Sequence, residues 1–382
     1  MNKIYVSHNN IVSSLGFDSP TVVEHIKSEV TGLALVENET LHAEPFYSSL
    51  INTGKLQAAF HELQSQDDYT RLEQMMIVSL QKVIEASNIT LDERVGLIIS
   101  TTKGNVDVLD ADNPFPKERA YLSELGRVVK AFFGFKNEAI VVSNACVSGI
   151  LSVAIAKRYI EQNVYDHVFV VSGDVVSEFI LSGFNSFQAM SNELCKPYDK
   201  HRKGINIGEV AASILVTKDD TNLADEAMAI LGEGSCNDAN HISGPSRTGE
   251  GLYRSMGTAF KEAGIKPENI DYISAHGTAT LFNDEMEAIA FNRMGLHEVP
   301  LNSLKGYFGH TLGASGLLET IVGMHSVHNK TLFKSLGFET MGVSQPINVI
   351  TYTTPHNMQT FLKTASGFGG CNTAVIFQKP TQ

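Results

Sequence analysis

The sequence has few cysteines, only four in 382 residues, and no two of them form a C-x-x-C pair. They are Cys146, Cys195, Cys236 and Cys371. Such wide spacing excludes a disulfide framework and gives no zinc-binding pattern. We therefore expect a protein without a metal site or structural disulfides that works in a reducing compartment, the cytoplasm.

The chain also lacks an excess of positive charge. Its 29 basic and 42 acidic side chains give a net charge of -13 at pH 7. Nucleic acids and anionic membrane surfaces attract basic proteins, so neither is expected as a main partner. The first residues, Met1 to His8, lack the basic and then apolar pattern of a signal peptide, so nothing indicates export.

No apolar run is uniform enough to predict a membrane span. The nearest candidate, Ala139 to Ala156, carries no charged residue, but it contains serines, an asparagine, a glycine and a turn signal in its middle. These polar and small residues favour a buried strand, turn and helix. With 43% hydrophobic residues, the chain can build a substantial core.

Low-complexity tracts, long linkers and short repeats are absent, yet the two halves of the chain look alike. In the first half we expect buried strands at Val95–Ser100, Ala139–Ser143 and Val168–Val171. In the second half we expect one at Ile270–Ser274. Strands alternating with helices predict an α/β fold whose sheet is covered on its faces, with reactive groups in loops at strand ends.

Each half also contains a helix of small residues that follows a turn. The helix starts Val147–Leu151 and Ala314–Leu318 have closely similar sequences, which indicates duplication. The stretch Leu336–Asn357 contains two prolines and is expected to be irregular. Further helices are expected at Tyr69–Ala86, Leu122–Phe133, Gly251–Ala263 and Asp284–Arg293.

Cys146 is the most informative residue, because it lies where the apolar strand ends and the small-residue helix begins. Unpaired N–H groups at a helix start favour thiolate over thiol and can also hold an oxyanion. Gly149 allows a chain segment or substrate to approach closely. A free cysteine alone is more often a small, inert core residue, so its neighbours decide the interpretation.

Two histidines change the interpretation of Cys146. His276 directly follows the strand Ile270–Ser274, and His310 follows a glycine turn. One histidine in such a place is more often a structural residue. Two at equivalent-looking places, together with a cysteine at a helix start, predict a catalytic group.

Two charged residues accompany the histidines. Lys305 precedes His310 in a glycine-bounded loop, and Glu287 follows His276 on an expected helix that also contains Asp284. Glu287 could give Lys305 a buried counter-charge that holds the histidine loops in place and tunes their pKa values. A solvated lysine and ordinary helix-face acids are the alternatives.

A glycine-rich loop, Ser366–Asn372, lies between two apolar strands near the C-terminus. Its glycines let the backbone approach a ligand, and the ring of Phe368 can swing as a gate. The alternative is a hairpin loop with one buried aromatic ring. A second polar glycine segment is interpreted as architectural, because the order of a phosphate-binding loop is absent. It comprises Asp199, Arg202, Gly204, Gly208 and Glu209.

Taken together, these segments resemble the β-ketoacyl synthases, the condensing enzymes of fatty acid and polyketide synthesis, which have the thiolase fold. The resemblance runs nearly end to end. Its most specific parts are the His-Gly-Thr motif at His276 and the segment Lys305–Gly316. Its other parts are Asn10–Gly16, Ser143–Cys146, Lys196–Asp199 with Arg202 to Glu209, and Gly367–Gly370.

The resemblance implies a thiolase-like fold with two duplicated βαβαβαββ halves in five αβαβα layers. We expect the halves at residues 1–220, with the nucleophile, and 221–382, with the histidines, the lysine and the gating loop. The fold also implies a flat two-fold sheet contact, and therefore a homodimer. A heterodimer with a homologous subunit stays open.

The resemblance further implies roles for the site residues. Cys146 would accept the acyl chain, while His276 and His310 would act on the malonyl unit. Lys305 and Glu287 would form the supporting ion pair.

Phe368 has two implied roles. Its ring would be the gate, and its backbone N–H would form the oxyanion hole together with the N–H of Cys146.

The implied reaction is a decarboxylative Claisen condensation. A carrier-bound acyl chain reacts with malonyl-acyl carrier protein to give a 3-oxoacyl thioester, without a metal or other cofactor. Two histidines point to the branch that elongates carrier-bound chains. Because carrier proteins are typically acidic, a local basic surface is expected. Its candidates are Lys196, Lys200, Arg202 and Lys203.

Several positions depart from the family pattern, although none removes a catalytic group. Val210 and Asn283 stand where glycine is usual, and Ser366 replaces a frequent phenylalanine. Asn9 and Asn10 replace small residues. Because Ser366 lies beside the gate, it could widen the acyl entrance, so a specialised polyene or polyketide pathway is as plausible as a housekeeping one.

Three other functions are alternatives to that of a condensing enzyme. A chain-length-type partner subunit of a heterodimer would lack the reactive cysteine, which is present here. A coenzyme A-dependent thiolase-like enzyme would replace the segment Lys305–His310. A cysteine hydrolase would need an acid-oriented histidine beside the thiol and ready access for water.

Overall fold

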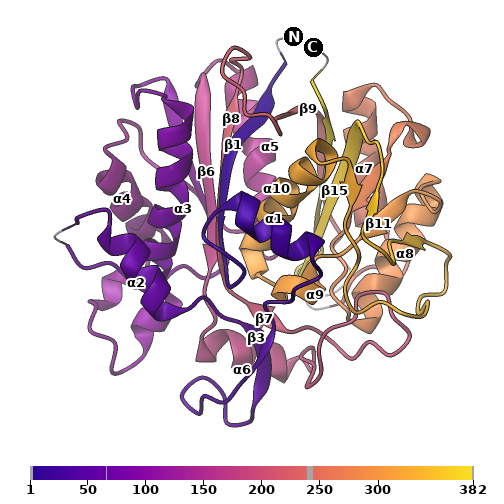
Figure 1. Cartoon of the computed structure of the whole chain (residues 1–382), viewed down its shortest axis with the longest axis horizontal. Coiled ribbons are helices and arrows are strands. Elements are labelled where there is room, and N and C mark those ends of the chain that lie inside the picture. The colour runs from indigo at the N-terminus through magenta and orange to yellow at the C-terminus, as the bar shows by residue number, and fades with distance from the viewer. Residues whose placement is uncertain (1–2, 66, 239–243, 381–382) are drawn as a thin grey trace.

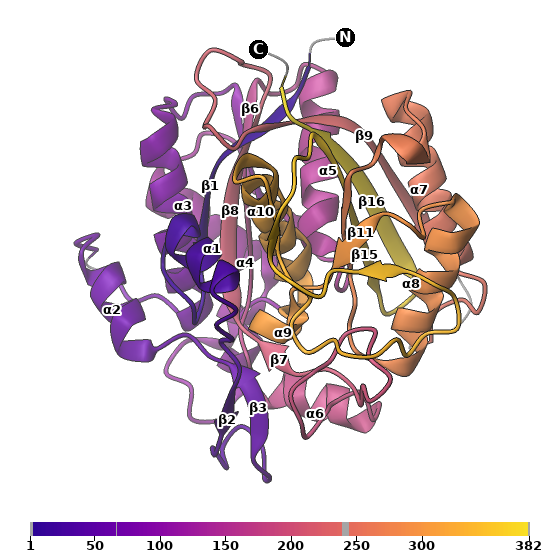
Figure 2. The same cartoon turned by 45° about the vertical axis from the view of Figure 1, so that its right-hand side comes forward.

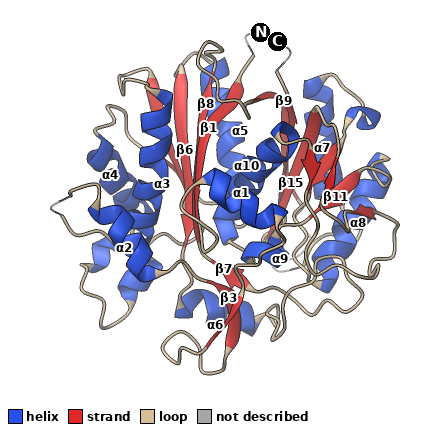
Figure 3. Cartoon of the chain, viewed as in Figure 1, coloured by secondary structure: helices blue, strands red, loops and turns tan. Residues whose placement is uncertain are grey.

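The computed structural model describes residues 3–65, 67–238 and 244–380. Strands and helices alternate along both halves of the chain (Figure 3). The first half contains β1 (Tyr5–Val12), α1 (Ser19–Lys27), β2 (Ala34–Val36), β3 (Phe46–Ser49), α2 (Thr53–His61), α3 (Arg71–Ser87), β4 (Val95–Ser100), α4 (Leu122–Phe133), β5 (Ile140–Val142), α5 (Ser148–Glu161), β6 (His167–Asp174), α6 (Glu178–Ser186), β7 (Ile207–Gly208) and β8 (Val210–Thr217). The second half contains β9 (Met228–Asn237), α7 (Glu250–Ala263), β10 (Tyr272–Ser274), α8 (Leu281–Met294), β11 (Pro300–Asn302), α9 (Lys305–Phe308), α10 (Ser315–His328), β12 (Thr331–Leu332), β13 (Asn348–Val349), β14 (Thr354–Pro355), β15 (Thr360–Gly367) and β16 (Cys371–Gln378).

The two halves repeat one topology. The first gives β1-α3-β4-α4-β5-α5-β6-β8 and the second gives β9-α7-β10-α8-β11-α10-β15-β16, so both read βαβαβαββ. Their strands also lie in the same spatial order, β5-β4-β6-β8-β1 and β11-β10-β15-β16-β9. In each half the first two of these neighbouring pairs are parallel and the last two are antiparallel. The expected duplication is confirmed.

The layers follow from this repeat (Figure 1). Helices α3 and α4 cover the outer face of the first sheet, and α7 and α8 lie outside the second. Helices α5 and α10 lie between the sheets, which the turned view shows clearly (Figure 2). Strand β1 pairs with β9 and joins both sheets into one of 11 strands, with β13 added at one edge. The predicted αβαβα layering of a thiolase-like fold is therefore confirmed.

The two central helices approach each other closely because the second residue of each is a glycine. A Cβ atom on Gly149 would lie 2.8 Å from the backbone N of Leu317, and one on Gly316 would lie 2.8 Å from the backbone N of Ile150. Side chains at these positions would force the helices apart. The glycines thus bring the first turns of α5 and α10 side by side, and the segments that precede these turns carry Cys146 and His310.

The secondary structure expected from the sequence agrees closely with the observed elements. Val95–Ser100 and Leu122–Phe133 have the predicted bounds. Helix α8 begins three residues earlier than Asp284, because the side chain of Thr280 accepts a hydrogen bond from the N–H of Asn283 and so caps it. Segment 336–357 contains only strands of two residues and is otherwise irregular, as expected.

The boundary predicted at residues 220 and 221 lies in the connection between β8 and β9. Buried apolar side chains fill the spaces between each sheet and its helices. In the part of the chain that the structure describes, no helix is long and apolar enough to cross a bilayer.

Candidate active site

Cys146 lies in a tight turn between β5 and α5. Ala145, just before it, has a left-handed backbone with φ of 44°, which costs a residue with a side chain about 1 kcal/mol or more. The hydroxyl of Ser148 holds this turn, because it accepts from the N–H of Asn144 at 2.8 Å and donates to the carbonyl of Ala145 at 2.6 Å. The turn directs the buried sulfur of Cys146 toward the second half of the chain.

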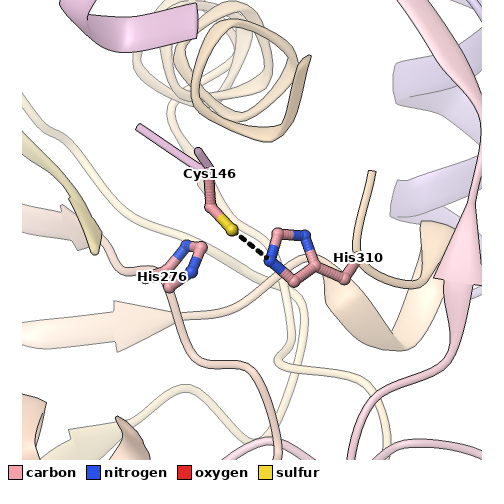
Figure 4. A group of neighbouring side chains, drawn as sticks. All are labelled: Cys146, His276 and His310. Atoms are coloured by element: carbon pink, nitrogen blue, oxygen red, sulfur yellow. Dashed lines mark hydrogen bonds between the residues drawn. The ribbon is translucent and has the colours of Figure 1, made fainter. Parts of the chain in front are cut away.

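His310 contacts the sulfur directly. Its Nε2 atom lies 3.1 Å from Sγ of Cys146 (Figure 4). Its Nδ1 atom accepts a hydrogen bond from the backbone N–H of Leu312 at 3.1 Å. An imidazole nitrogen that accepts carries no hydrogen, so in the neutral ring the hydrogen is on Nε2 and points at the sulfur.

His276 completes a group of three side chains. Its ring meets that of His310 edge to face, with centroids 5.2 Å apart. Its Nδ1 atom is buried and has no hydrogen-bond partner among the described residues. Burial, reinforced by the positive charge of Lys305, lowers the pKa of both histidines well below the ordinary 6.5. Both rings are therefore neutral at pH 7.

The group could also be considered as a metal site, because one ligand atom from each of Cys146, His276 and His310 lies within 4.8 Å of the others. The tautomer of His310 argues against this use. Its nitrogen that faces the sulfur is the one that carries the hydrogen, so no lone pair is directed between them. The arrangement instead presents a thiol beside an N–H donor.

The protonation state of Cys146 corrects one expectation. The helix start was expected to favour the thiolate, but burial is the largest influence and raises the pKa of this thiol to about 12. The charge of Lys305 and the backbone N–H of Phe368 lower it and only partly offset the burial. The thiol is therefore protonated in the resting protein.

This protonation state predicts how Cys146 reacts with iodoacetamide. The thiolate is the reactive form, so the alkylation rate should rise about tenfold per pH unit from about pH 7 to pH 9. Intact-mass measurement gives the rate, and the Cys146→Ser variant gives the background from the other cysteines. A rate that levels off below about pH 8 would show that the thiolate is already formed.

Lys305 has a different partner from the one expected. Its Nζ atom lies 2.6 Å from Oε1 of Glu319 on α10, and it donates to the carbonyl of His276 at 2.8 Å. The predicted pair with Glu287 is wrong. The carboxylate of Glu287 instead accepts the backbone N–H groups of His276 at 2.9 Å and Gly277 at 2.6 Å. Both acids hold the His276 segment, but only Glu319 reaches the lysine.

Neutralising Lys305 should destabilise the protein strongly. The pair with Glu319 is buried on both sides, and removal of one partner from such a pair typically costs about 3–5 kcal/mol. We expect this loss for Lys305→Met in urea unfolding. The control Lys203→Met breaks an exposed pair with Glu193 and should cost less than about 1 kcal/mol. Equal losses of unfolding free energy in the two variants would contradict a buried ion pair between Lys305 and Glu319.

A pocket of about 430 Å³ leads to the sulfur and to both histidines. Phe368 lines it, half-buried, and contacts Phe184 at 5.6 Å and Phe187 at 5.4 Å between ring centroids. Gly369 beside it has φ of 84° and open space at the Cβ position. The two phenylalanines on and after α6 were not identified from the sequence, because nothing along the chain places them near the loop at Phe368.

The space in front of the Cys146 amide depends on Gly367. A Cβ atom there would lie 3.0 Å from the backbone N of Cys146 and would cover it. Ser366, which also lines the pocket, donates to the side chain of Asn372 at 2.7 Å. Asn283 donates to Glu287 at 3.0 Å and so adds to the support of the His276 segment.

The second glycine segment has the architectural contacts expected of it. A Cβ atom on Gly208 would lie 1.9 Å from the carbonyl oxygen of Phe308. Glu209 accepts from the N–H of Ile51 at 2.8 Å and pairs with Arg71. These contacts hold β7 against the loop of His310, whose N–H donates to the carbonyl of Asn206 at 2.6 Å.

The fold and this arrangement of thiol, neutral imidazoles and amide define an acyl-transferring enzyme of the thiolase-like class. Two family profiles match the sequence. "Beta-ketoacyl synthase, N-terminal domain" matches residues 31–222, and "Beta-ketoacyl synthase, C-terminal domain" matches residues 228–339. The chain belongs to the β-ketoacyl synthase family.

Curated relatives and solved structures agree with this assignment. The chain is 26% identical to 3-oxoacyl-[acyl-carrier-protein] synthase 2 of Coxiella burnetii, over 80% of this chain and 81% of that protein. It is 24% identical to the Staphylococcus aureus enzyme of the same name, over 99% and 98%. A ketosynthase in complex with its chain length factor from Xenorhabdus doucetiae superposes with a TM-score of 0.87 at 24% identity, over 99% of this chain and 98% of that chain.

Proposed function

We propose that the chain catalyses the decarboxylative Claisen condensation of a carrier-bound acyl chain with malonyl-acyl carrier protein, in fatty acid or polyene and polyketide synthesis. The observation that carries the proposal is the contact between the thiol of Cys146 and the Nε2–H of His310, with His276 beside them. The names of the curated relatives support the use of an acyl carrier protein.

In the first step, the sulfur of Cys146 attacks the carbonyl carbon of the acyl thioester. The thiol loses its proton as the new carbon–sulfur bond forms, and the carrier thiol leaves with a proton. We assign the oxyanion hole to the backbone N–H groups of Cys146 and Phe368, since two fixed donors stabilise such an oxyanion best. The N–H of Phe368 already faces the sulfur, and Gly367 leaves the N–H of Cys146 uncovered.

In the second step, malonyl thioester loses carbon dioxide and leaves an enolate. We assign the binding of its oxygen to His276 and His310, because neutral imidazoles donate hydrogen bonds without bringing a charge. The enolate carbon then attacks the acyl group on Cys146. The carbon–sulfur bond breaks, the 3-oxoacyl thioester forms on the carrier, and the sulfur takes up a proton.

We assign the gate to the ring of Phe368. It lies in the pocket next to the glycines 367, 369 and 370, and only two rings, Phe184 and Phe187, pack against it in the described part of the chain. A ring held by other rings and by flexible backbone can move aside when an acyl chain enters.

The carrier protein would dock near the mouth of the pocket, where Lys203 contributes to the lining. An acidic carrier is attracted to lysines there. Of the four basic candidates, Arg202 is buried and lies 3.7 Å from Asp284, so we withdraw it from the docking surface. Lys196, Lys200 and Lys203 remain candidates.

We place the reaction in the cytoplasm, where the four free cysteines stay reduced.

A homodimer is the proposed assembly. Strand β5 ends the long sheet and, among the described strands, pairs with β4 alone, so its outer edge can offer N–H and C=O groups to a second copy. Its residues Ile140 and Val141 are apolar and only half-buried. Division of the chain at residues 220 and 221 would leave this edge wholly within the first half.

Sedimentation tests the assembly. We expect one species at twice the chain mass of 41.6 kDa. Only monomer at micromolar concentration would contradict the homodimer. A dimer that forms only after a homologous subunit is added would favour the heterodimer instead.

Intact-mass measurement tests the proposed function. The protein is incubated with a panel of acyl-carrier thioesters that differ in chain length and unsaturation, and the mass increase of the acyl group is followed. The adduct should be lost in Cys146→Ala and kept in Cys236→Ser, which changes a half-buried cysteine elsewhere. An adduct from coenzyme A thioesters alone would instead favour a thiolase-like enzyme.

A further inference from the structure

Lys363 is a fully buried lysine, with 0% of its surface exposed, in the middle of β15. It lies directly beside the strand that leads to His276, because β15 and β10 are parallel neighbours and Lys363 is opposite Ser274. A lysine almost never occupies such a position unless its charge is paired and its hydrogens are bound.

The ammonium group of Lys363 binds three backbone carbonyls. Its Nζ atom lies 2.9 Å from the carbonyl oxygen of Ser274, 3.2 Å from that of Ala275 and 2.7 Å from that of Thr364. Lysine has three N–H groups, so this set uses all of them. Two of the three bonds fix the backbone just before His276.

The counter-charge comes from Glu319. Its Oε2 atom lies 2.8 Å from Nζ of Lys363 and forms an ion pair with it. Its Oε1 atom pairs with Lys305, which also donates to the carbonyl of His276. One carboxylate thus holds two ammonium groups, and three successive carbonyls, those of Ser274, Ala275 and His276, each receive a lysine N–H.

The effect of Lys363 is directed at one histidine. Burial is the largest cause of the lowered pKa of both histidines; the charge of Lys305 adds to it at both, and the smaller contribution of Lys363 acts on His276. Two of the described acids contact the two lysines or the His276 segment. Glu287 accepts the backbone N–H of His276, and Glu319 is shared by Lys305 and Lys363.

We propose that Lys363 is a positioning residue that fixes the end of β10 and so aims the ring of His276 at the malonyl unit. This inference rests on the proposed function, because it concerns the second step, the decarboxylation. The two steps should therefore respond differently to a substitution at this position. Loss of the ammonium should impair decarboxylation of malonyl thioester but leave acyl transfer to Cys146 nearly intact.

Two variants of Lys363 test the proposal. Lys363→Met keeps the volume but removes the charge, and it should slow decarboxylation about 10- to 100-fold, as small misplacements of a reacting group do. Acyl loading of Cys146 should stay within about twofold of the wild type. Lys363→Ala leaves a space lined by three carbonyls and a carboxylate, so added ammonium or methylamine should restore much of its decarboxylation. Lys363→Met, whose side chain fills this space, should not respond to the added amine.

The matched control is Lys157→Met. Lys157 is also buried and paired with two carboxylates, those of Glu161 and Glu262, and its side-chain hydrogen bonds in the described part of the chain go to these acids rather than to the histidine segments. It should lower stability without changing the ratio of decarboxylation to loading. Thermal unfolding of all the variants shows which are folded at the assay temperature.

The outcomes distinguish this inference from the proposed function. A folded Lys363→Met variant that decarboxylates within about twofold of the wild type would overturn the inference, as would equal losses of loading and decarboxylation. Absence of rescue in a folded Lys363→Ala variant that decarboxylates slowly would also count against it. A wild-type protein that neither loads an acyl group nor decarboxylates malonyl thioester would overturn the proposed function instead.

Discussion

Replacing Cys146 with alanine is expected to abolish acyl loading and to reduce condensation at least about a thousandfold, because alanine lacks the thiol that we propose as the acyl acceptor. The other cysteines do not substitute for it. Cys195 and Cys371 are buried, and neither they nor Cys236 lines the pocket that leads to the histidines. Intact mass after incubation with an acyl carrier thioester measures loading, and product formation measures condensation.

The same variant should still decarboxylate malonyl thioester. The two imidazoles remain in place, and their support comes from the backbone of β10 and from Leu312 rather than from the thiol. Cys236→Ser serves as the control and should load normally. Loading that persists in Cys146→Ala would show that another residue is the nucleophile.

Replacing either His276 or His310 with alanine is expected to reduce decarboxylation about 100- to 1,000-fold, the loss typical of one oxyanion-hole donor. Acyl loading should persist, although His310→Ala also loses the N–H that faces the sulfur and should load more slowly than His276→Ala. Carbon dioxide release from malonyl carrier protein measures the first effect, and intact mass measures the second.

A suitable control is His325→Ala on α10. His325 is also buried, but it hydrogen-bonds Asn9 and lies outside the pocket, so decarboxylation should change little. Decarboxylation by the wild type should also stay nearly constant as pH falls through 6.5, because burial lowers the pKa of His276 and His310 below that value and keeps both rings neutral. A loss of activity centred on pH 6.5 would contradict two buried, neutral donors.

The sequence predicted most of the fold because its elements have local signals. Strand β4 and helix α4 have the predicted bounds, since an uninterrupted apolar run and a helical apolar period mark them directly. The duplication was also visible, because Gly149 and Gly316 stand at the same place in two similar helix starts. Only the structure shows why they matter, since these glycines bring α5 and α10 into contact.

The charged support of the site was harder to predict. Glu287 follows His276 closely along the chain, and the family resemblance implies an ion pair between it and Lys305. In the folded protein its carboxylate is occupied by two backbone amides, and Glu319, from a different helix, takes the lysine. Distance along the sequence does not show which carboxylate a buried ammonium reaches. Lys363 had no local signal at all, because one lysine in an apolar strand is also typical of an exposed edge.

The electrostatic state of Cys146 was likewise decided by the fold. Position at a helix start is a local property, and by itself it favours the thiolate. Burial is a property of the whole structure, and desolvation of a charge outweighs the few N–H groups that face the sulfur. Local sequence therefore gave the wrong sign for the shift of this pKa.

By itself, the sequence determined which elements form and which reactive side chains stand at their ends, because capping, periodicity and glycine turns act over a few residues. The tertiary structure alone decided that Cys146, His276 and His310 meet, that Glu319 serves both Lys305 and Lys363, and that the thiol rests protonated. The physical reason is that burial and charge pairing depend on distances between segments far apart along the chain, and packing of the two sheets around the central helices sets those distances.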